Sequence, residues 1–272
     1  FRRLMSIFKY LGISAAEAYL KYQTIRFNTP DAYNDPYEMQ VRFKSKVEIE
    51  ASYKQINFHL HGNSGCIEQY LIVDDSEYPF SLDTSVYEDI CGKVGMSCFS
   101  ESESKIPDNV LMWAHYAESH RGLAIKLKEG SFITSILNKV NYVTSTPVLD
   151  ASILSESSFF VSDLYFKSTD WKYEQERRLA IPLSECDTLD NKDIYGFPIH
   201  VHDLPVNDVE MIFLGSNASR ELLKLGYEFH QKFGVPVIKQ KARSDRFGFM
   251  ATASFGPSLQ ECIELNEHYG IK

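Results

Sequence analysis

The sequence predicts an α+β protein with a mixed β-sheet core and flanking helices. Short runs of β-branched and aromatic residues alternate loosely with capped, amphipathic helical stretches over 272 residues. The strand candidates look mixed rather than purely parallel in their patterning, which favours an α+β fold over a doubly wound one. No internal repeat and no Gly/Ser-rich linker divides the chain. We therefore expect a single domain, residues 1–272, with a core over 1–255 and a C-terminal tail over 256–272.

The elements follow from periodicity and from end signals. We expect strands at 6–10, 24–27, 94–100, 123–127, 140–143, 174–181, 211–215 and 235–240. We expect helices at 15–23, 108–121, 152–167 and 219–233. Ser14, Asp108 and Ser219 are the expected helix N-caps. The stretch from about 45 to 90 is polar and mixed, and predicts no regular element.

Composition excludes several classes of protein. The net charge of −9 and the isoelectric point of about 5.4 argue against a wide duplex-binding face, which carries excess Lys and Arg. No apolar run approaches the ~20 residues of a membrane span, so we expect no membrane association. The cysteines are odd in number and lack C-x-x-C spacing, which predicts a reducing, cytoplasmic location without disulfide or zinc. They are Cys66, Cys91, Cys98, Cys186 and Cys262.

The segment with the most chemistry runs from Trp171 to Pro182. Alternation along a strand would place Glu174, Glu176 and Arg178 on one face. Reactions that pass through an oxocarbenium-like ion need a carboxylate near the anomeric carbon. The alternative is an exposed edge strand with salt-bridged charges. If the two glutamates are close neighbours, Glu176→Gln should relieve repulsion and leave the fold intact.

A second group of candidates follows the predicted helix at 108–121. Trp113, Tyr116 and His120 fall at i, i+3 and i+7, so they share a helical face. Such an aromatic stripe is more often core than cofactor pocket. Arg121, at the exit of the helix, could reach a phosphate or a carboxylate. His115 and His120 diverge, which argues against a two-histidine metal site.

A third group lies near the start of the chain. Lys9 and Tyr10 are on the first predicted strand, and Arg26 and Asn28 are at the second. Arg26 sits between apolar neighbours, so its guanidinium should meet an anion. The run Asn34-Asp35-Pro36-Tyr37-Glu38 is first of all a turn that caps a following helix. The sequence contains neither of the two common phosphate-binding loops, G-x-x-x-x-G-K-[ST] and G-x-G-x-x-G. It also lacks the H-E-x-x-H motif of zinc proteases and the G-x-S-x-G elbow of α/β-hydrolases.

These groups, in this order, resemble the bacterial domain-of-unknown-function 2971 family. The resemblance covers about residues 7–215. Its matching pieces are Phe8-Lys9-Tyr10, Phe27, Asn34-Asp35-Pro36-Tyr37-Glu38, Cys98-Phe99-Ser100, Leu111-Met112-Trp113-Ala114-His115-Tyr116, His120-Arg121-Gly122, Lys167, Trp171, Tyr173-Glu174, Glu176 and Arg178. Arg177 stands where the family's run has a Trp, which puts the role of that aromatic in doubt.

The run Glu174-Gln175-Glu176 followed by Arg178 to Pro182 is also similar to the Glu-x-Glu strand of ADP-ribosyltransferases. This resemblance implies an ADP-ribosyltransferase-like fold in which Glu176 holds the ribose hydroxyl and stabilises the oxocarbenium ion. It implies that Glu174 orients or activates the acceptor. The cofactor-binding residues that we assign by this analogy are Lys9, Tyr10, Arg26, Asn28, Trp113, Tyr116, His120, Arg121 and Arg178.

The resemblance implies an enzyme that uses NAD as a substrate and modifies a macromolecule, either protein or nucleic acid. A bacterial toxin or phage-defence effector, with an antitoxin or another operon partner, fits this activity; no metal is expected. Two alternatives stay open at this point. One is an N-glycosidase that uses the same glutamates with water as the acceptor. The other is a non-catalytic sensor or binding module in a defence or toxin–antitoxin operon.

Overall fold

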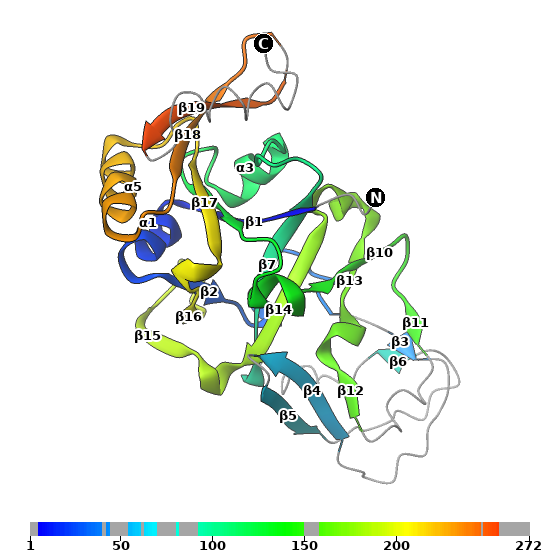
Figure 1. The fold of residues 1–272 in the computed structure, drawn as a ribbon. Helices are drawn as coiled ribbons and strands as arrows, with labels where there is room; N and C mark the ends of the chain where they lie inside the picture. The colour runs from blue at the N-terminus through cyan, green and yellow to red at the C-terminus, as the bar shows by residue number, and fades with distance from the viewer. Residues whose placement is uncertain are drawn as a thin grey trace. The chain divides into compact units, whose positions relative to one another are not determined.

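The computed structural model describes residues 5–39, 42–43, 54–60, 63–69, 80–81, 92–149, 158–245 and 247–255 (Figure 1). Contacts between Cα atoms divide the chain into two compact units. Unit 1 comprises Phe1–Ile25, Phe99–Ser135 and Asp203–Lys272, and unit 2 comprises Arg26–Cys98 and Ile136–His202. Each unit is therefore assembled from segments that are far apart in the sequence. The single domain over 1–272 stays a prediction, and the expected tail, 256–272, lies outside the described residues.

Unit 1 is built on a mixed sheet with the strand order β19-β18-β17-β8-β1-β7. The strands are β1 Ser6–Leu11, β7 Val94–Ser102, β8 Leu123–Leu127, β17 Val209–Leu214, β18 Val237–Ala242 and β19 Phe249–Phe255. Strand β7 contributes to this unit from Phe99 onward. Strands β17 and β18 pair in parallel, whereas the β1–β7, β1–β8, β8–β17 and β18–β19 pairs are antiparallel. The α+β class and the mixed sheet are thus confirmed.

The helices of unit 1 bury one face each. They are α1 Ile13–Tyr22, α3 Val110–Tyr116, α4 Phe132–Ile136, which ends in unit 2, and α5 Arg220–Phe233, together with the 3₁₀ helix η6 Val206–Asp208. In α5, Ser219 caps the first turn through Leu222 N (3.1 Å). Gly234, in the left-handed region, ends this helix. Helices α1 and α5 meet through Tyr19 and Phe229, whose ring centroids are 5.8 Å apart.

Unit 2 contains several small sheets. Two have the orders β11-β3-β6 and β12-β4-β5, and β10-β13 form a parallel pair. A third has the order β15-β16-β2, in which β2 belongs to this unit from Arg26 onward and β16 up to His202. The antiparallel pair β14-β9 follows β7 in the strand order. The further strands are β2 Thr24–Phe27, β3 Arg42–Phe43, β4 Lys54–Leu60, β5 Asn63–Gln69, β6 Phe80–Ser81, β9 Asn138–Lys139, β10 Asn141–Val143, β11 Val148–Leu149, β12 Ser158–Phe160, β13 Phe166–Ser168, β14 Glu176–Pro182, β15 Asp187–Lys192 and β16 Pro198–Asp203. The 3₁₀ helices are η1 Pro30–Ala32, η3 Val161–Leu164, η4 Thr169–Glu174 and η5 Leu183–Glu185.

Two predicted stretches differ from the structure. The helix expected at 152–167 is wrong over its described part, 158–167, where β12, η3 and β13 follow one another. This stretch contains Phe159, Phe160, Val161 and Phe166, and a short apolar run of this kind does not distinguish helix from strand. The expected irregular stretch 45–90 includes β4, β5 and β6. None of the helices described here is long and apolar enough to cross a membrane.

Helix α3 ends five residues before the predicted boundary, at Tyr116, in an unusual left-handed turn. Glu118, Ser119 and His120 all have positive φ angles, 45°, 55° and 66°. A non-glycine residue in this region costs about 1–2 kcal/mol. The turn is fixed by backbone bonds, among them Ser119 N to Ala114 O (3.1 Å) and Asn217 N to His120 O (2.9 Å). Tertiary contacts therefore override the helical pattern of the sequence here.

Two glycines allow the backbone to pass close to this turn. A Cβ on Gly122 would lie 1.9 Å from the Leu11 carbonyl oxygen, and one on Gly215 would lie 2.1 Å from the His120 carbonyl oxygen. Two predicted caps are also corrected. Asn109, rather than Asp108, caps α3 by accepting from Leu111 N and Met112 N, and Gly12 stands at the start of α1 instead of Ser14.

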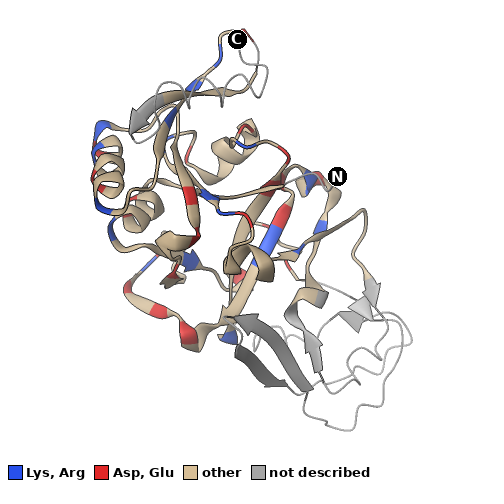
Figure 2. Cartoon of the chain, viewed as in Figure 1, with Lys and Arg blue, Asp and Glu red and all other residues tan. Residues whose placement is uncertain are grey.

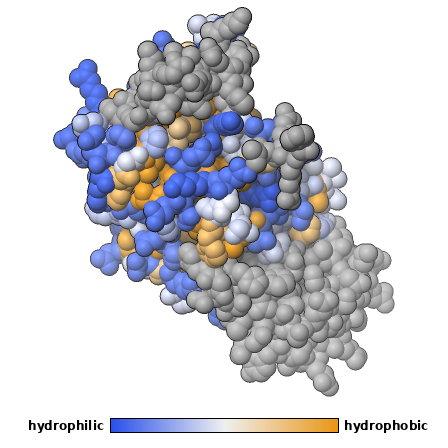
Figure 3. All heavy atoms as spheres, in the orientation of Figure 1, coloured by the Kyte–Doolittle hydropathy of each residue, from blue (hydrophilic) through white to orange (hydrophobic). Residues whose placement is uncertain are grey.

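The face shown in Figure 3 is largely hydrophilic over its described part, with smaller apolar areas between.

Candidate functional site

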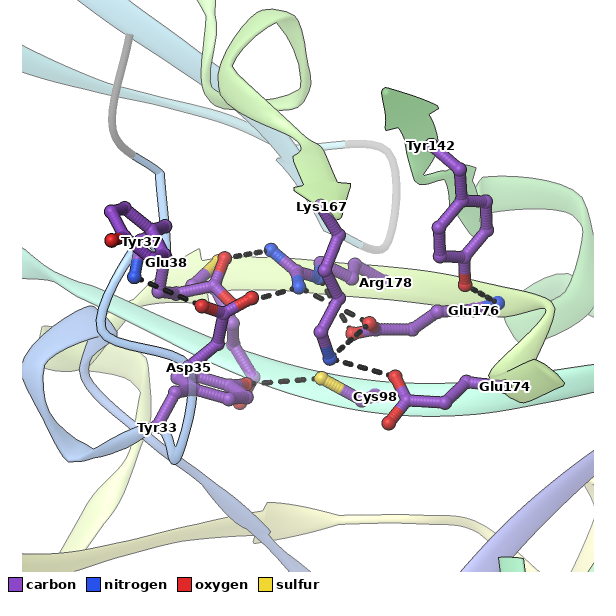
Figure 4. A network of polar contacts seen from close by, with 11 residues as sticks. Tyr33, Asp35, Tyr37, Glu38, Cys98, Tyr142, Lys167, Glu174, Glu176 and Arg178 are labelled. Carbon is purple, nitrogen blue, oxygen red and sulfur yellow. Dashed lines mark hydrogen bonds and ion pairs between the residues drawn. The ribbon is translucent and has the colours of Figure 1, made fainter. Parts of the chain in front are cut away.

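The charged residues of unit 2 form a buried network around Arg178 (Figure 4). This guanidinium is 0% exposed. It donates from Nε to Glu176 Oε1 at 2.7 Å and from Nη2 to Glu176 Oε2 at 3.2 Å. On its other side it binds both carboxylate oxygens of Glu38, one of them from Nη2 at 2.9 Å. Arg178 therefore joins two carboxylates, from segments of the chain that are far apart in the sequence.

A second buried cation, Lys167 on β13, links the two glutamates of the Glu-x-Glu run. Its ammonium donates to Glu174 Oε2 at 2.7 Å and to Glu176 Oε2 at 3.2 Å. It also lies 4.8 Å from the ring centroid of Trp171, within the range of a cation–π contact. Acidic and basic residues are close together along β14 and its neighbours in Figure 2.

The backbone brings the two glutamates together by a route that differs from the predicted strand 174–181. Glu174 ends the 3₁₀ helix η4, and β14 begins only at Glu176. Between them, Gln175 adopts a left-handed conformation with φ 45°. Its side chain donates to Lys172 O at 2.7 Å, which fixes the bend. Strand alternation therefore does not explain the pair; a kink at Gln175 turns both carboxylates toward Lys167.

The loop that follows η1 supplies Glu38 to the network. Asp35 Oδ1 accepts from Tyr37 N at 2.9 Å, and Glu38 N donates to Asp35 O at 3.1 Å. These bonds form a turn in which Glu38 points inward to Arg178 while Tyr37 is exposed. Met39, fully buried and with φ 56°, follows. The Asn-Asp-Pro run makes the predicted turn, but residues 36–39 are themselves a turn rather than the start of a helix.

Aromatic rings surround the Arg178 guanidinium. The ring centroids of Tyr33 and Tyr165 lie 5.7 Å and 5.2 Å from its central carbon. Cys98 Sγ donates to Tyr33 Oη at 3.2 Å, and Tyr33 Oη donates to Met96 O at 2.8 Å. The guanidinium is therefore shielded from water by rings as well as neutralised by carboxylates, which strengthens its ion pairs.

The network shifts the proton affinities of its members in different directions. Burial would raise the pKa of Glu176, but the charges of Arg178 and Lys167 outweigh it and hold that pKa below its usual range. Burial raises the pKa of Glu38, and the charge of Arg178 offsets this rise only in part. Burial alone would lower the pKa of Lys167, yet Glu176 and Glu174 raise it above the ordinary lysine value. Glu176 is thus an anion at neutral pH and Lys167 a cation.

This arrangement defines what the site can do chemically. Glu176 cannot serve as a general acid near neutral pH, because its proton is lost at low pH. A fixed, ionised carboxylate in a low-dielectric site can stabilise a cation that develops close by. Both oxygens of Glu176 are, however, already bonded to Arg178 or Lys167. Any developing cation would therefore compete with these two partners.

A pocket of about 250 Å³ lies next to the network in unit 2. It opens where the parallel strands β10 and β13 end, at Val143 and Ser168. The residues that line it are Tyr37, Val143, Thr144, Ser145, Thr146, Pro147, Phe166, Lys167 and Ser168. Lys167 belongs to both the pocket wall and the charge network. Lys167 would consequently lie between a ligand in this pocket and the two glutamates that it contacts.

In unit 1, three predicted site residues pack on one another as rings. Trp113 is 0% exposed, and its Nε1 donates to Pro107 O at 2.6 Å. Its ring lies 5.4 Å from Tyr10, edge to face, and 6.3 Å from His120, stacked. Phe249 lies 5.1 Å from His120 and completes the cluster. This packing corresponds to the core alternative for the aromatic stripe.

The other predicted site residues have separate surroundings. In unit 1 the Lys9 ammonium lies 5.3 Å from the Phe99 ring, Tyr116 is half-buried and Arg121 is exposed. In unit 2 the backbone of Asn28 pairs with Met96. Arg26 binds Asp193 Oδ2 at 2.8 Å, which confirms that its guanidinium meets an anion.

Of the predicted site residues, the structure brings Glu174, Glu176 and Arg178 into one cluster. Sequence reasoning did not assign Glu38, Lys167 or Tyr33 to the site. Glu38 and Lys167 are among the residues on which the expected family resemblance rests, and that expectation was the signal that could have found them. Tyr33 gave no such signal.

Among the described residues, no group of three or more His, Cys, Asp or Glu side chains could hold a metal ion. Cys98 and Cys186 are both in the thiol form.

Comparisons of the chain with protein-family models, with curated proteins and with solved structures find no match.

Proposed function

We propose that this protein is an ADP-ribosyltransferase-like enzyme that uses NAD as a substrate to modify a macromolecule. One observation carries the proposal: Glu174 and Glu176 converge on a single buried ammonium, Lys167, beside a pocket lined by hydroxyl groups. Paired carboxylates beside the sugar are the usual arrangement for cleaving a glycosidic bond through an oxocarbenium-like transition state. A role as a bacterial toxin or phage-defence effector, with a neutralising partner, is part of this proposal.

In the proposed reaction the bond between the ribose C1′ and the nicotinamide nitrogen breaks, and nicotinamide leaves with the electron pair. Glu176, held as an anion, stabilises the positive charge that develops on the ribose. Glu174 orients the acceptor, whose nucleophile forms the new bond to C1′ and loses its proton. Arg178 and Lys167 are positioning residues in this scheme, because they fix the two carboxylates.

The test uses Glu174→Gln, which keeps the side-chain shape but removes a charge that contacts Lys167. Incubation of the purified protein with labelled NAD and a lysate should give labelled macromolecules. Loss of one preorganised electrostatic contact commonly costs about 100- to 1000-fold in rate, and we expect Glu174→Gln to fall in this range. The control is Glu17→Gln, whose carboxylate is 38% exposed and pairs with Lys21 one helical turn away. Turnover per folded molecule that is equal in both variants would contradict the assignment. Free ADP-ribose without labelled macromolecules would indicate the N-glycosidase instead.

A non-catalytic binding module is the second candidate, and the saturation of Glu176 favours it. Both of its oxygens are bonded to buried cations, which is typical of a structural network as well. Under this alternative, the wild-type protein does not consume NAD, and Glu174→Gln changes only the melting temperature. Measuring turnover and melting temperature on the same preparations separates the two candidates.

A further inference from the structure

The pocket at the ends of β10 and β13 has a lining with a definite chemistry. Tyr37, Thr144, Ser145, Thr146 and Ser168 carry hydroxyl groups, and Val143, Pro147 and Phe166 add apolar surface. Apolar walls with a few polar groups are typical of small-molecule sites, because the polar groups orient the ligand. A ring with hydroxyl substituents matches this lining on both counts.

The charge of the lining argues against a phosphate as the occupant. Lys167 is the cationic residue among those that line the pocket. Its ammonium already contacts Glu174 at 2.7 Å and Glu176 at 3.2 Å. A phosphate group would therefore meet two carboxylates behind one shared cation, and like charges at close range are costly. The pocket fits an uncharged group.

Tyr37 gives the pocket an exposed aromatic wall whose backbone is held in place. The residue is 64% exposed although it is large and apolar in part. Its backbone is tied to Asp35 on one side (2.9 Å), and its neighbour Glu38 is bound to the buried Arg178 on the other. An aromatic ring that is exposed yet held by its backbone is preorganised to stack on a flat ligand, since little entropy is lost on binding.

The size of the pocket limits how much of a ligand it can hold. Its volume of about 250 Å³ is just under the range of ~300–1000 Å³ that is usual for complete small-molecule sites. It can hold one nucleoside-sized portion of a ligand, while a whole dinucleotide would extend beyond it.

We propose that this pocket is a nucleoside subsite, in which the heterocycle stacks on Tyr37 and the ribose hydroxyls meet the hydroxyl groups of residues 144–146. The choice of a nucleoside rests on the proposed function. The site itself, an uncharged hydroxyl-bearing ring against Tyr37, follows from the lining and its charges.

The test measures the dissociation constant of adenosine, an uncharged nucleoside, by ligand-observed NMR, on the full chain and on three variants. Stacking of a base on an aromatic side chain is worth about 1–3 kcal/mol by alanine substitution, which corresponds to about 5- to 150-fold in affinity. We expect Tyr37→Ala to weaken binding of adenosine by this factor. Tyr37→Phe keeps the ring and should stay close to the wild-type affinity. Tyr195→Ala is the matched control, because Tyr195 is also exposed (80%) but does not line the pocket.

The outcomes separate this subsite from the proposed enzymatic function. Nucleoside binding that depends on Tyr37, without any NAD turnover, supports the subsite and contradicts the enzyme. NAD turnover with no nucleoside binding at millimolar concentration, or with equal affinities in wild type and Tyr37→Ala, overturns the subsite alone. Inorganic phosphate is the competing probe. If it displaces the nucleoside, the pocket is an anion site and the proposal is wrong.

Discussion

The two units hold their central side chains by different means. In unit 1, Tyr10, Trp113 and His120 pack as rings against Phe249, and burial of aromatic surface is the main stabilising contribution. In unit 2, the central side chains are ions, and each charge of the network around Arg178 contacts at least one opposite charge. The first cluster depends on shape and volume, and the second depends on charge balance. A substitution that preserves shape should therefore be harmless in one unit and damaging in the other.

The charge balance of the network around Arg178 is close but not complete. Three carboxylates, those of Glu38, Glu174 and Glu176, face two cations, Lys167 and Arg178. Removal of one partner from a buried ion pair leaves an uncompensated charge in the low-dielectric interior. The resulting loss of stability is larger than the net contribution of the pair itself. The network is thus sensitive to single substitutions even if its net contribution to stability is small.

The largest expected effect is that of Glu176→Gln on stability. From the sequence alone, this change relieves repulsion between neighbouring glutamates; the structure places Glu176 between two cations, so we now expect destabilisation. Breaking a buried pair lowers the free energy of unfolding by about 3–5 kcal/mol. Urea denaturation of the variant and of Glu17→Gln measures the difference, and the exposed pair at Glu17 should contribute about 1 kcal/mol at most. Equal stabilities in the two variants would mean that the network is not buried as described.

The pH dependence of stability sharpens the same contrast. The pKa of Glu176 is lower in the folded protein than its ordinary value of about 4.3. Its stabilising contribution is therefore complete above that value and is lost as the pH falls toward the folded pKa. Burial raises the pKa of Glu38, so its protonation favours the folded state on acidification and offsets part of the loss. Melting temperatures measured from neutral pH down to about pH 3 should fall more steeply for wild type than for Glu176→Gln. Parallel curves would remove Glu176 as the source.

The smallest of the three effects concerns shape in unit 1. A Cβ on Gly122 would lie 1.9 Å from the Leu11 carbonyl oxygen, so Gly122→Ala must displace the backbone. Overpacking of this kind typically costs about 1–3 kcal/mol. Gly92→Ala is the control, because no atom lies within 4 Å of the added carbon. Urea denaturation of both variants tests this; a Gly122 variant as stable as the Gly92 variant would show that the contact between β1 and the left-handed turn can relax.

The local elements were largely predictable from the sequence, because their signals are local. The strand at 24–27 and the strand at 123–127 have the predicted bounds, and α5 begins at its predicted cap, Ser219. The failures occur where a conformation depends on distant contacts. Gln175 and the turn at 118–120 adopt left-handed φ angles. Such angles are typical of glycine, and these residues are not glycines, so the sequence does not indicate them.

The candidate site was predictable only in part. Glu174, Glu176 and Arg178 stand within five residues of one another, so the sequence could group them. Glu38 is 140 residues away from Arg178 along the chain, and no local pattern indicates that the two residues meet. A single sequence shows which charges are unusual but does not show which distant charge neutralises them. The pairing of the Glu176 carboxylate with two buried cations is therefore visible only in the structure.

The alternation of the two units along the chain has a consequence for the order in which they can be completed during translation. Both segments of unit 2 have been synthesised once the ribosome passes His202. Unit 1 has by then received its first two segments, but β17, β18 and β19 are still to come. Strand β8 would wait for its neighbour β17 with one edge unpaired, and unpaired edges are prone to association with other chains. The charge network can thus form early, whereas the sheet of unit 1 is the part of a nascent chain that most needs protection.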